Sequence, residues 1–150
     1  MAVCQAQDSF FQSWTRDNLF HAFMEMNIGF MSWGTLEKGI LTGRVTPDRT
    51  FDDKDVRSHA PWWTSVDHQP YFETMARLNP LLAEQGHSGL ELALSHVLSS
   101  DVSTTALCGA RSVAQVEGLV AATERLLSEA LLTECHEVRR TFFPVDTEIE

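Results

Sequence analysis

Short apolar runs that alternate with helical patterns constrain the fold of this chain more than any other feature of its sequence. The clearest run is Ile28–Trp33. It directly follows a segment in which Leu19, Phe23 and Met24 recur at helical spacing. A short apolar run that begins where a helix ends is typical of a buried strand in a parallel sheet. We therefore expect a helix followed by a parallel strand in this part of the chain.

The same alternation extends along the whole chain, in which we find no internal repeat and no flexible linker. The expected elements, in order, are a strand over 2–7, a helix with Thr15 as N-cap, the strand over 28–33, a helical turn over 36–41, a helix over 71–85, a helix after Ser88, a strand over 104–108, and helices after Ser112 and Ser128. Strands that alternate with helices favour a parallel α/β fold.

Local signals refine three of these helices. Ser88 and Glu91 form a capping-box pattern at the start of one helix. Pro80 should kink or divide the helix over 71–85, because proline has no N–H to donate to the preceding turn. The helix after Ser112 carries four apolar positions that we expect to form its buried face: Val113, Val116, Leu119 and Val120.

Size and charge exclude several classes of function. The chain has 150 residues and a formal net charge of −10, so we expect one domain, over residues 1–150, with a sizeable core. An acidic surface argues against binding to nucleic acid or to an anionic membrane, but it leaves room for a local basic pocket that holds a phosphate group. No apolar run reaches about 18 residues, so no transmembrane helix is expected.

The cysteines and the N-terminus indicate a compartment. The three cysteines are Cys4, Cys108 and Cys135; their odd number and wide spacing fit free thiols in a reducing environment. No signal peptide is visible at the N-terminus. We therefore expect a cytoplasmic protein. The histidines and cysteines show no metal-ligand spacing, so no metal site is expected, and His96 is interpreted as a structural residue of its helix.

The long connection over 45–70 leaves two interpretations open. Its aspartates and basic residues are mixed in the way that usually marks a solvated surface; they include Asp55 and Arg57. Trp62 and Trp63 follow, and two adjacent tryptophans in a loop need cover. Such a loop can act as a lid over a site, or it can simply cap a core.

Ligands in parallel α/β folds bind beyond the C-terminal ends of the strands. We expect three such ends. They carry Gln5, then Trp33 with the glycine-rich loop that follows, and then Gly109–Arg111 before a helix N-terminus. An arginine beside the free N–H groups of a helix N-terminus outlines a phosphate site, although such an arginine is more often a plain surface residue. Trp33 is suited to stacking on a planar ring, but a tryptophan there is more often part of the core.

Four segments resemble, in the same order, segments of the aldo-keto reductases. Residues 28–44, IGFMSWGTLEKGILTGR, resemble the family segment that usually reads IGVLAYSPLAQGLLTGK. Residues 106–115 resemble ALWGARSPEQL, and residues 51–62 and 86–98 match the segments between them. Together these matches cover nearly the whole chain.

The resemblance implies a fold and an activity. The expected fold is the C-terminal portion of a (β/α)8 TIM-type barrel, with about three parallel strands and flanking helices. The implied activity is the reduction of a small-molecule carbonyl substrate by hydride transfer from NADP(H). The family's catalytic Asp, Tyr, Lys and His lie on earlier strands, so no residue here is assigned a catalytic role.

The resemblance also implies cofactor-binding residues, position by position. Gln5 matches the glutamine that holds the nicotinamide carboxamide, and Trp33 matches the aromatic residue that stacks on the nicotinamide ring. The loop around the pyrophosphate would include Gly34, Leu36, Lys38 and Gly39. The segment around the 2′-phosphate and adenosine would include Gly109, Ala110, Arg111 and Gln115. The chain departs from the family pattern at Asp8, at Thr35 and at the pair Gly118 and Leu119.

Three strands of a closed barrel would leave two unpaired edges. Three functional hypotheses follow. The chain is the cofactor-binding part of a reductase and is inactive alone, or it is a non-catalytic nucleotide-binding module, or it is an oligomeric remnant without a ligand. Its partners would be a carbonyl substrate once the missing half completes the pocket, a complementing chain, or further copies of itself.

Overall fold

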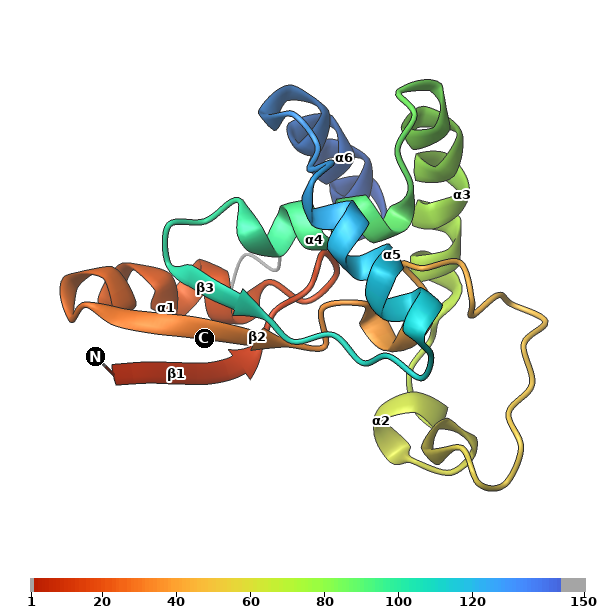
Figure 1. Cartoon of the computed structure of the whole chain (residues 1–150). Helices are drawn as coiled ribbons and strands as arrows, with labels where there is room; N and C mark the ends of the chain where they lie inside the picture. Colours follow the sequence, from red (N-terminus) through yellow and green to blue (C-terminus); the bar gives the residue numbers. More distant parts are fainter. Residues whose placement is uncertain (1, 144–150) are drawn as a thin grey trace.

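A three-stranded parallel sheet forms one end of the molecule (Figure 1). The computed structural model describes residues 2–143, and of Thr104 the backbone alone. Strands β1 (Ala2–Gln7), β2 (Ile28–Trp33) and β3 (Ser103–Ala106) lie in the order β1-β2-β3, and both pairs are parallel. The expected α/β arrangement with three parallel strands is confirmed, although the third strand begins and ends slightly earlier than its apolar run suggested.

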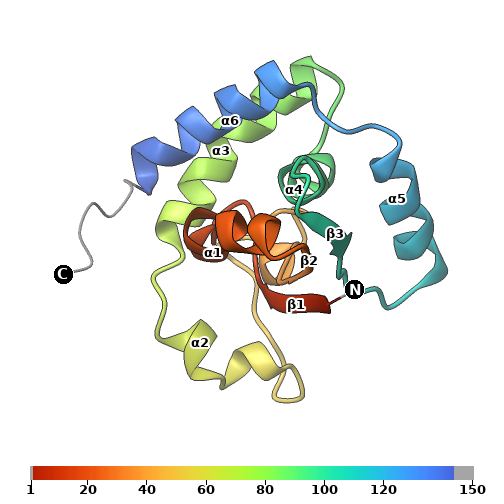
Figure 2. The same ribbon diagram turned by 90° about the vertical axis from the view of Figure 1, so that its left-hand side faces the viewer.

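Helices make up most of the remaining described chain. Their bounds are α1 Trp14–Glu25, α2 Pro61–Thr64, α3 Gln69–Glu84, α4 Gly89–Leu98, α5 Val113–Thr123 and α6 Glu129–Phe142, with short 3₁₀ turns at η1 Glu37–Gly39 and η2 Val56–Ser58. The ribbons of α1 and α4 lie on one side of the sheet, and α3 and α6 run side by side beyond α4 (Figure 2).

The buried apolar residues form two clusters. A small cluster packs α1 against the sheet and consists of Phe20, Phe23, Phe30 and Val102. The larger cluster lies between α3, α4 and α6, and it includes Phe10, Leu41 and Leu78. Helix α4 sits at its centre, and every residue from 91 to 97 is buried. The core therefore holds the helices and loops together largely away from the sheet.

Two local expectations about helices are wrong. Helix α1 begins after Ser13, and Thr15 is a buried residue of its first turn rather than its N-cap. Helix α3 runs undivided over its 16 residues with Pro80 inside. Both Pro80 and Ala76, whose carbonyl would have accepted the missing N–H, are exposed. Water can therefore hydrate that carbonyl, and the helix continues because its other side is anchored in the core.

The capping signals of the other helices are confirmed. At the start of α4 the backbone N–H of Ser88 donates to the Glu91 carboxylate at 2.6 Å, which completes the expected capping box. Ser112 caps α5 and Ser128 caps α6, each accepting a backbone N–H from the residue three positions on. These caps act within one turn of backbone, so the local sequence is enough to specify them.

The expected buried face of α5 is exposed. Val113, Val116 and Val120 have exposed fractions of 73%, 51% and 58%, and Leu119 is half-buried. Only Ala122 of this helix is buried. Helical spacing predicts which side chains share a face but does not say what covers that face, and nothing in the described part of the chain covers this one.

One face of the sheet is also uncovered. Side chains alternate along a strand, so Cys4 and Ala6 face the small core while Val3, Gln5 and Gln7 face the other way. Val3 is 46% exposed and Trp33 is 44% exposed. We call the side formed by Val3, Gln5, Gln7, Met31 and Trp33 the open face. No helix of the described residues lies against it in Figure 2.

Candidate functional site

The three strands end at one edge of the sheet, because they are parallel. Gln7 lies opposite Trp33 in the register of β1 and β2. Beyond these residues the Asp8 N–H donates to the Trp33 carbonyl at 3.2 Å, and the Leu107 N–H donates to the Ser32 carbonyl at 2.9 Å. The loops that follow all three strands therefore start side by side, as ligand-binding loops do in parallel α/β folds.

Gln5 is not at the end of its strand. β1 continues to Gln7, and Gln5 lies opposite Met31, two positions before the edge. Its side chain is exposed. Because residues two apart on a strand point the same way, Gln5 shares the open face with Gln7 and Trp33. Gln5 can thus reach only a ligand that lies over this face.

Trp33 ends β2 on the same face, and it is not a core residue. Its exposed fraction of 44% leaves part of the indole ring free. Gly34 follows with a φ of +78°, and a Cβ added there would approach the Gln7 side chain to 3.4 Å. The chain turns sharply away from the sheet at this point, which is why a glycine suits it.

The loop after β2 has a rare backbone. Glu37, Lys38 and Gly39 follow one another with φ values of +44°, +54° and +104°. A left-handed conformation is uncommon for Glu and Lys, so the surroundings must hold the chain in it. Part of that support comes from packing, because Leu36 contacts the larger core, and a Cβ added at Gly39 would come within 2.9 Å of Val45.

Glu37 supplies further support, and the sequence did not single it out. Its side chain is 2% exposed. Its carboxylate accepts a hydrogen bond from the Ser9 hydroxyl and forms an ion pair with the Lys38 ammonium. Glu37 therefore ties the loop after β2 to the chain after β1. It also balances the charge of Lys38, whose side chain is 25% exposed. Only its position in a glycine-rich loop could have drawn attention to it.

A second segment fastens the same loop from outside. Arg57 donates to the Lys38 carbonyl at 2.6 Å and to the Asp55 carboxylate at 2.6 and 2.8 Å. Its guanidinium lies over the Phe51 ring, 4.1 Å from the centroid. Asp55 and Arg57 are half-buried, so the interpretation of these two residues as part of a solvated surface is wrong. The charges link two loops instead.

Neighbouring charges hold the pKa of Asp55 well below its usual range. Hydrogen bonds from Arg57 are the main cause, and the positive charge of Arg111 adds to it. Arg111 is therefore near enough for its charge to act on this loop, although it lies far along the sequence. Trp63 packs against the larger core while Trp62 is 47% exposed. The long connection thus caps the core in part; the lid interpretation stays a prediction.

The third loop leads into α5. The Ser112 hydroxyl accepts the Gln115 N–H at 3.3 Å, and the Gln115 side-chain oxygen accepts the Arg111 N–H at 2.6 Å. Gly109, Ala110 and Arg111 are exposed, and a Cβ at Gly109 would meet nothing within 4 Å. Within residues 2–143 the Arg111 guanidinium forms no ion pair within 4 Å. Its charge is available to a ligand.

The three loops lie at one edge of the sheet, but not all of their side chains face the solvent. Trp33, Lys38 and Arg111 present side chains that a ligand could reach, whereas Leu36 and Gly39 shape the loop from within. The Thr35 hydroxyl hydrogen-bonds to the Cys108 thiol, whose pKa is raised by burial. The loop after β2 and the loop after β3 therefore meet at this contact.

Comparison with known proteins decides the family. Residues 1–140 match the model of the Aldo/keto reductase family. This chain is a member of the aldo-keto reductase family. It is 31% identical over 112 residues to aldo-keto reductase YhdN of Bacillus subtilis (strain 168), an alignment that covers 68% of this chain and 34% of that protein.

Solved structures agree on the fold. Glycerol dehydrogenase AKR11B4 from Gluconobacter oxydans matches with a TM-score of 0.82 at 23% identity, over 100% of this chain and 46% of that one. The holo form of aldo-keto reductase AKR11C1 from Bacillus halodurans matches with a TM-score of 0.66 at 20% identity, over 92% and 42%. These neighbours are (β/α)8 barrels. The aldo-keto reductase chain therefore has the fold of part of such a barrel, and it spans less than half the length of the relatives it matches.

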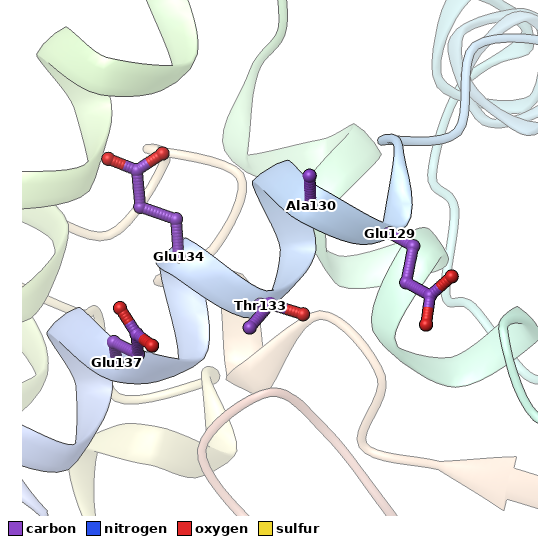
Figure 3. Close-up of a pocket in the computed structure, with 5 residues that line it drawn as sticks. All are labelled: Glu129, Ala130, Thr133, Glu134 and Glu137. Carbon is purple, nitrogen blue, oxygen red and sulfur yellow. The ribbon is translucent and has the colours of Figure 1, made fainter.

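Metal ligands, membrane spans and carboxylate clusters are further features that could indicate a function of the aldo-keto reductase chain. In the described part of the chain, no group of three or more His, Cys, Asp or Glu residues could hold a metal ion, and no helix is long and apolar enough to cross a membrane. A shallow hollow on α6 is lined by Glu129, Glu134 and Glu137 among others (Figure 3). Figure 3 shows Glu129 and Glu134 pointing away from each other, so they do not converge on one ligand.

Proposed function

We propose that this chain is the NADP(H)-binding part of an aldo-keto reductase, and that hydride transfer to a carbonyl substrate depends on barrel strands outside these 150 residues. The main observation in support is the edge where β2 and β3 end. It presents a partly exposed tryptophan ring and an unpaired arginine, with the tightly held loop of residues 34–39 beside them.

The exposed groups fit the parts of such a cofactor. Trp33 offers a flat surface for the nicotinamide ring, and Gln5 on the same face has an amide that can bond a carboxamide. Gly34, Leu36, Lys38 and Gly39 would border the pyrophosphate. Gly109, Ala110, Arg111 and Gln115 would surround the adenosine and its 2′-phosphate.

Lys38 and Arg111 would contribute differently to the binding of the cofactor phosphates. Glu37 already balances the charge of Lys38, so Lys38 adds little net attraction for a phosphate. Arg111 has no such partner among the described residues and lies just before the N-terminus of α5, where free N–H groups and the helix dipole favour an anion. We therefore assign the 2′-phosphate to Arg111, which would make the chain prefer NADP(H) over NAD(H).

The open face supports the second half of the proposal. When bound, the cofactor would supply a hydride to a carbonyl carbon. Gln5 and Trp33 would orient the nicotinamide over the open face, against which no helix of the described residues lies (Figure 2). Further barrel strands that carry the acid–base residues and the substrate pocket would have to pack against the open face. The protein would act in the reducing cytoplasm, where NADP(H) is found.

The test is NADP(H) binding by the purified chain. Arg111→Ala should weaken NADPH binding by about 1.5–3 kcal/mol, the contribution of a charged hydrogen bond, and leave NADH binding unchanged. Arg77→Ala is the matched control, because Arg77 is an exposed arginine on α3, away from this edge. Binding is followed by nicotinamide fluorescence. Equal NADPH affinities of the Arg111→Ala and parent chains would refute the assignment.

A second candidate function is assembly. Val3 and Trp33 on the open face, together with Val113 and Val120 on α5, form exposed apolar surface that isolated soluble chains rarely retain. Further copies of this chain, or a complementing chain, would cover this surface and the free edges of β1 and β3. Light scattering tests this idea, and a stable monomer at high concentration would count against self-assembly.

A further inference from the structure

A second polar pocket is lined by residues of α1, α4 and α6 and of the positions next to these helices. It has a volume of about 270 Å³. Its lining residues are Ser13, Arg16, Asp17, His96, Ser99, His136, Arg139 and Arg140. A concentration of three arginines and two histidines is unexpected in a chain with a net charge of −10.

The arginines are held in place but incompletely paired. Arg16 forms an ion pair with the buried Asp8 carboxylate at 2.7 Å and donates to the His96 carbonyl at 2.9 Å. Arg139 donates to the Phe10 carbonyl at 2.6 Å and to the Ser13 hydroxyl at 3.2 Å. Its Nε is buried without a hydrogen-bond partner. Arg140 is exposed and has no ion-pair partner within 4 Å among residues 2–143.

The histidines form a chain that ends in the pocket. His96 Nε2 faces the Asp8 carboxylate at 3.6 Å, and His96 Nδ1 lies 3.3 Å from His136 Nε2. When His136 Nε2 donates to His96 Nδ1, the proton of His96 is on Nε2, which faces Asp8 without forming a hydrogen bond. The Nδ1 of His136 is then the nitrogen left to take up a proton. Both histidines resist protonation because burial lowers the pKa of each, and nearby arginines lower them further.

The charges around His136 leave a positive excess. Arg16, Arg139 and Arg140 carry three positive charges, while Asp8 and Asp17 carry two negative charges. Asp17 accepts the Ser13 hydroxyl at 2.7 Å, and Asp8 is fully buried behind the pocket. The floor of the pocket thus offers N–H donors and one uncompensated positive charge, the combination that binds oxyanions.

We propose that this pocket binds a small oxyanion, a phosphate, sulfate or carboxylate group, held by Arg139, Arg140 and His136. A bound anion offsets the excess charge and favours the protonated form of His136, which then donates from both ring nitrogens. Binding is therefore linked to the uptake of a proton and strengthens as the pH falls. The three residues that would hold the anion all lie on α6 and none belongs to the cofactor-binding residues, so the proposal stands whether or not the chain binds NADP(H).

Sulfate is the probe, because its own charge stays constant across the pH range of the test. The ring-proton resonances of His136 are followed by NMR while sulfate is added to the full chain at constant ionic strength. We expect a saturable shift that is stronger at about pH 4 than at about pH 6, because the pKa of His136 in the free chain is about 3. Arg140→Ala should weaken the binding about tenfold, as expected for one charged contact, and Arg140→Glu should abolish it.

Two control variants test whether sulfate binds in this pocket and not elsewhere on the chain. Arg77→Ala, on the exposed side of α3, and Arg111→Ala, at the cofactor edge, should leave the sulfate affinity unchanged. Arg140 is exposed and makes no ion pair in the described part of the chain, so its replacement should not unfold the protein, which circular dichroism verifies. The proposal is overturned if the shift does not saturate, if Arg140→Ala leaves the affinity unchanged, or if Arg111→Ala removes the binding.

Discussion

Two glycine-to-alanine substitutions in helices should change stability in opposite directions. Gly89 is the first residue of α4 and is buried, and Gly118 lies in the middle of α5. Alanine is the better helix former in a helix interior by about 0.5–1 kcal/mol, which applies to Gly118 but not to Gly89 at the first position of its helix. The surroundings differ. A Cβ at Gly89 would lie 2.1 Å from the Leu41 carbonyl oxygen and 3.2 Å from its carbon, while a Cβ at Gly118 would meet nothing within 4 Å.

The magnitude follows from the contact at Gly89. Real Cβ atoms essentially never approach another heavy atom more closely than 3.0 Å, so α4 and the loop that carries Leu41 must separate by about 1 Å. Forcing extra volume into a packed core costs about 1–3 kcal/mol. Gly89→Ala should therefore lower the free energy of unfolding by about 1–3 kcal/mol. Gly118→Ala should raise it by about 0.5–1 kcal/mol.

Urea unfolding followed by circular dichroism measures both effects. Gly118→Ala is the control without a contact, so a loss of stability in Gly89→Ala alone reports the cost of the contact with Leu41. Each kcal/mol should also shift Tm by about 2–4 °C in a chain of this size. A Gly89→Ala variant as stable as Gly118→Ala would refute the close approach of α4 to the Leu41 carbonyl.

The remaining predictions concern acid stability and α3. Burial lowers the pKa of His136 from the usual 6.5 to about 3, so in that window the unfolded chain binds more protons and the free energy of unfolding must fall as the pH falls. His136→Gln cannot titrate, and urea titrations between about pH 5 and 7.5 should show a shallower dependence; an unchanged slope would contradict the burial of this ring. Pro80→Ala restores an N–H donor to the Ala76 carbonyl inside α3 and should stabilise the chain by about 1–3 kcal/mol, whereas an unchanged urea midpoint would show that the proline costs nothing there.

Much of the fold could be predicted because its signals are local. The capping box of Ser88 and Glu91 and the Ser112 cap depend on hydrogen bonds within one helical turn. The strand over 28–33 follows from an apolar run bounded by a helix and a glycine. Pro80 shows the limit of such signals, because tertiary anchoring of α3 overrides a residue that normally divides a helix.

The candidate site could be predicted only in part. Trp33 and Arg111 lie where strand ends were expected, so their shared edge follows from the parallel order of the strands. Their exposure does not follow from it and is decided by the fold. Gln5 was placed at a strand end, but β1 continues beyond it. Glu37 was missed because its burial depends on Ser9, which is 28 residues away in the sequence. No local pattern reports a contact of that kind.

The sequence by itself determined the order of the strands and helices and their caps, because these depend on residues that are neighbours along the chain. It also indicated membership of the aldo-keto reductase family, because the matching segments can be recognised in their order along the chain. Tertiary structure alone decided which surfaces are covered. Val113, Val116 and Val120 form an apolar stripe as their spacing predicts, yet the stripe is exposed. Arg57 was one charge among many until the fold brought it to the Lys38 carbonyl. Periodicity fixes the direction of a side chain, but burial and pairing depend on what the folded chain brings to meet it.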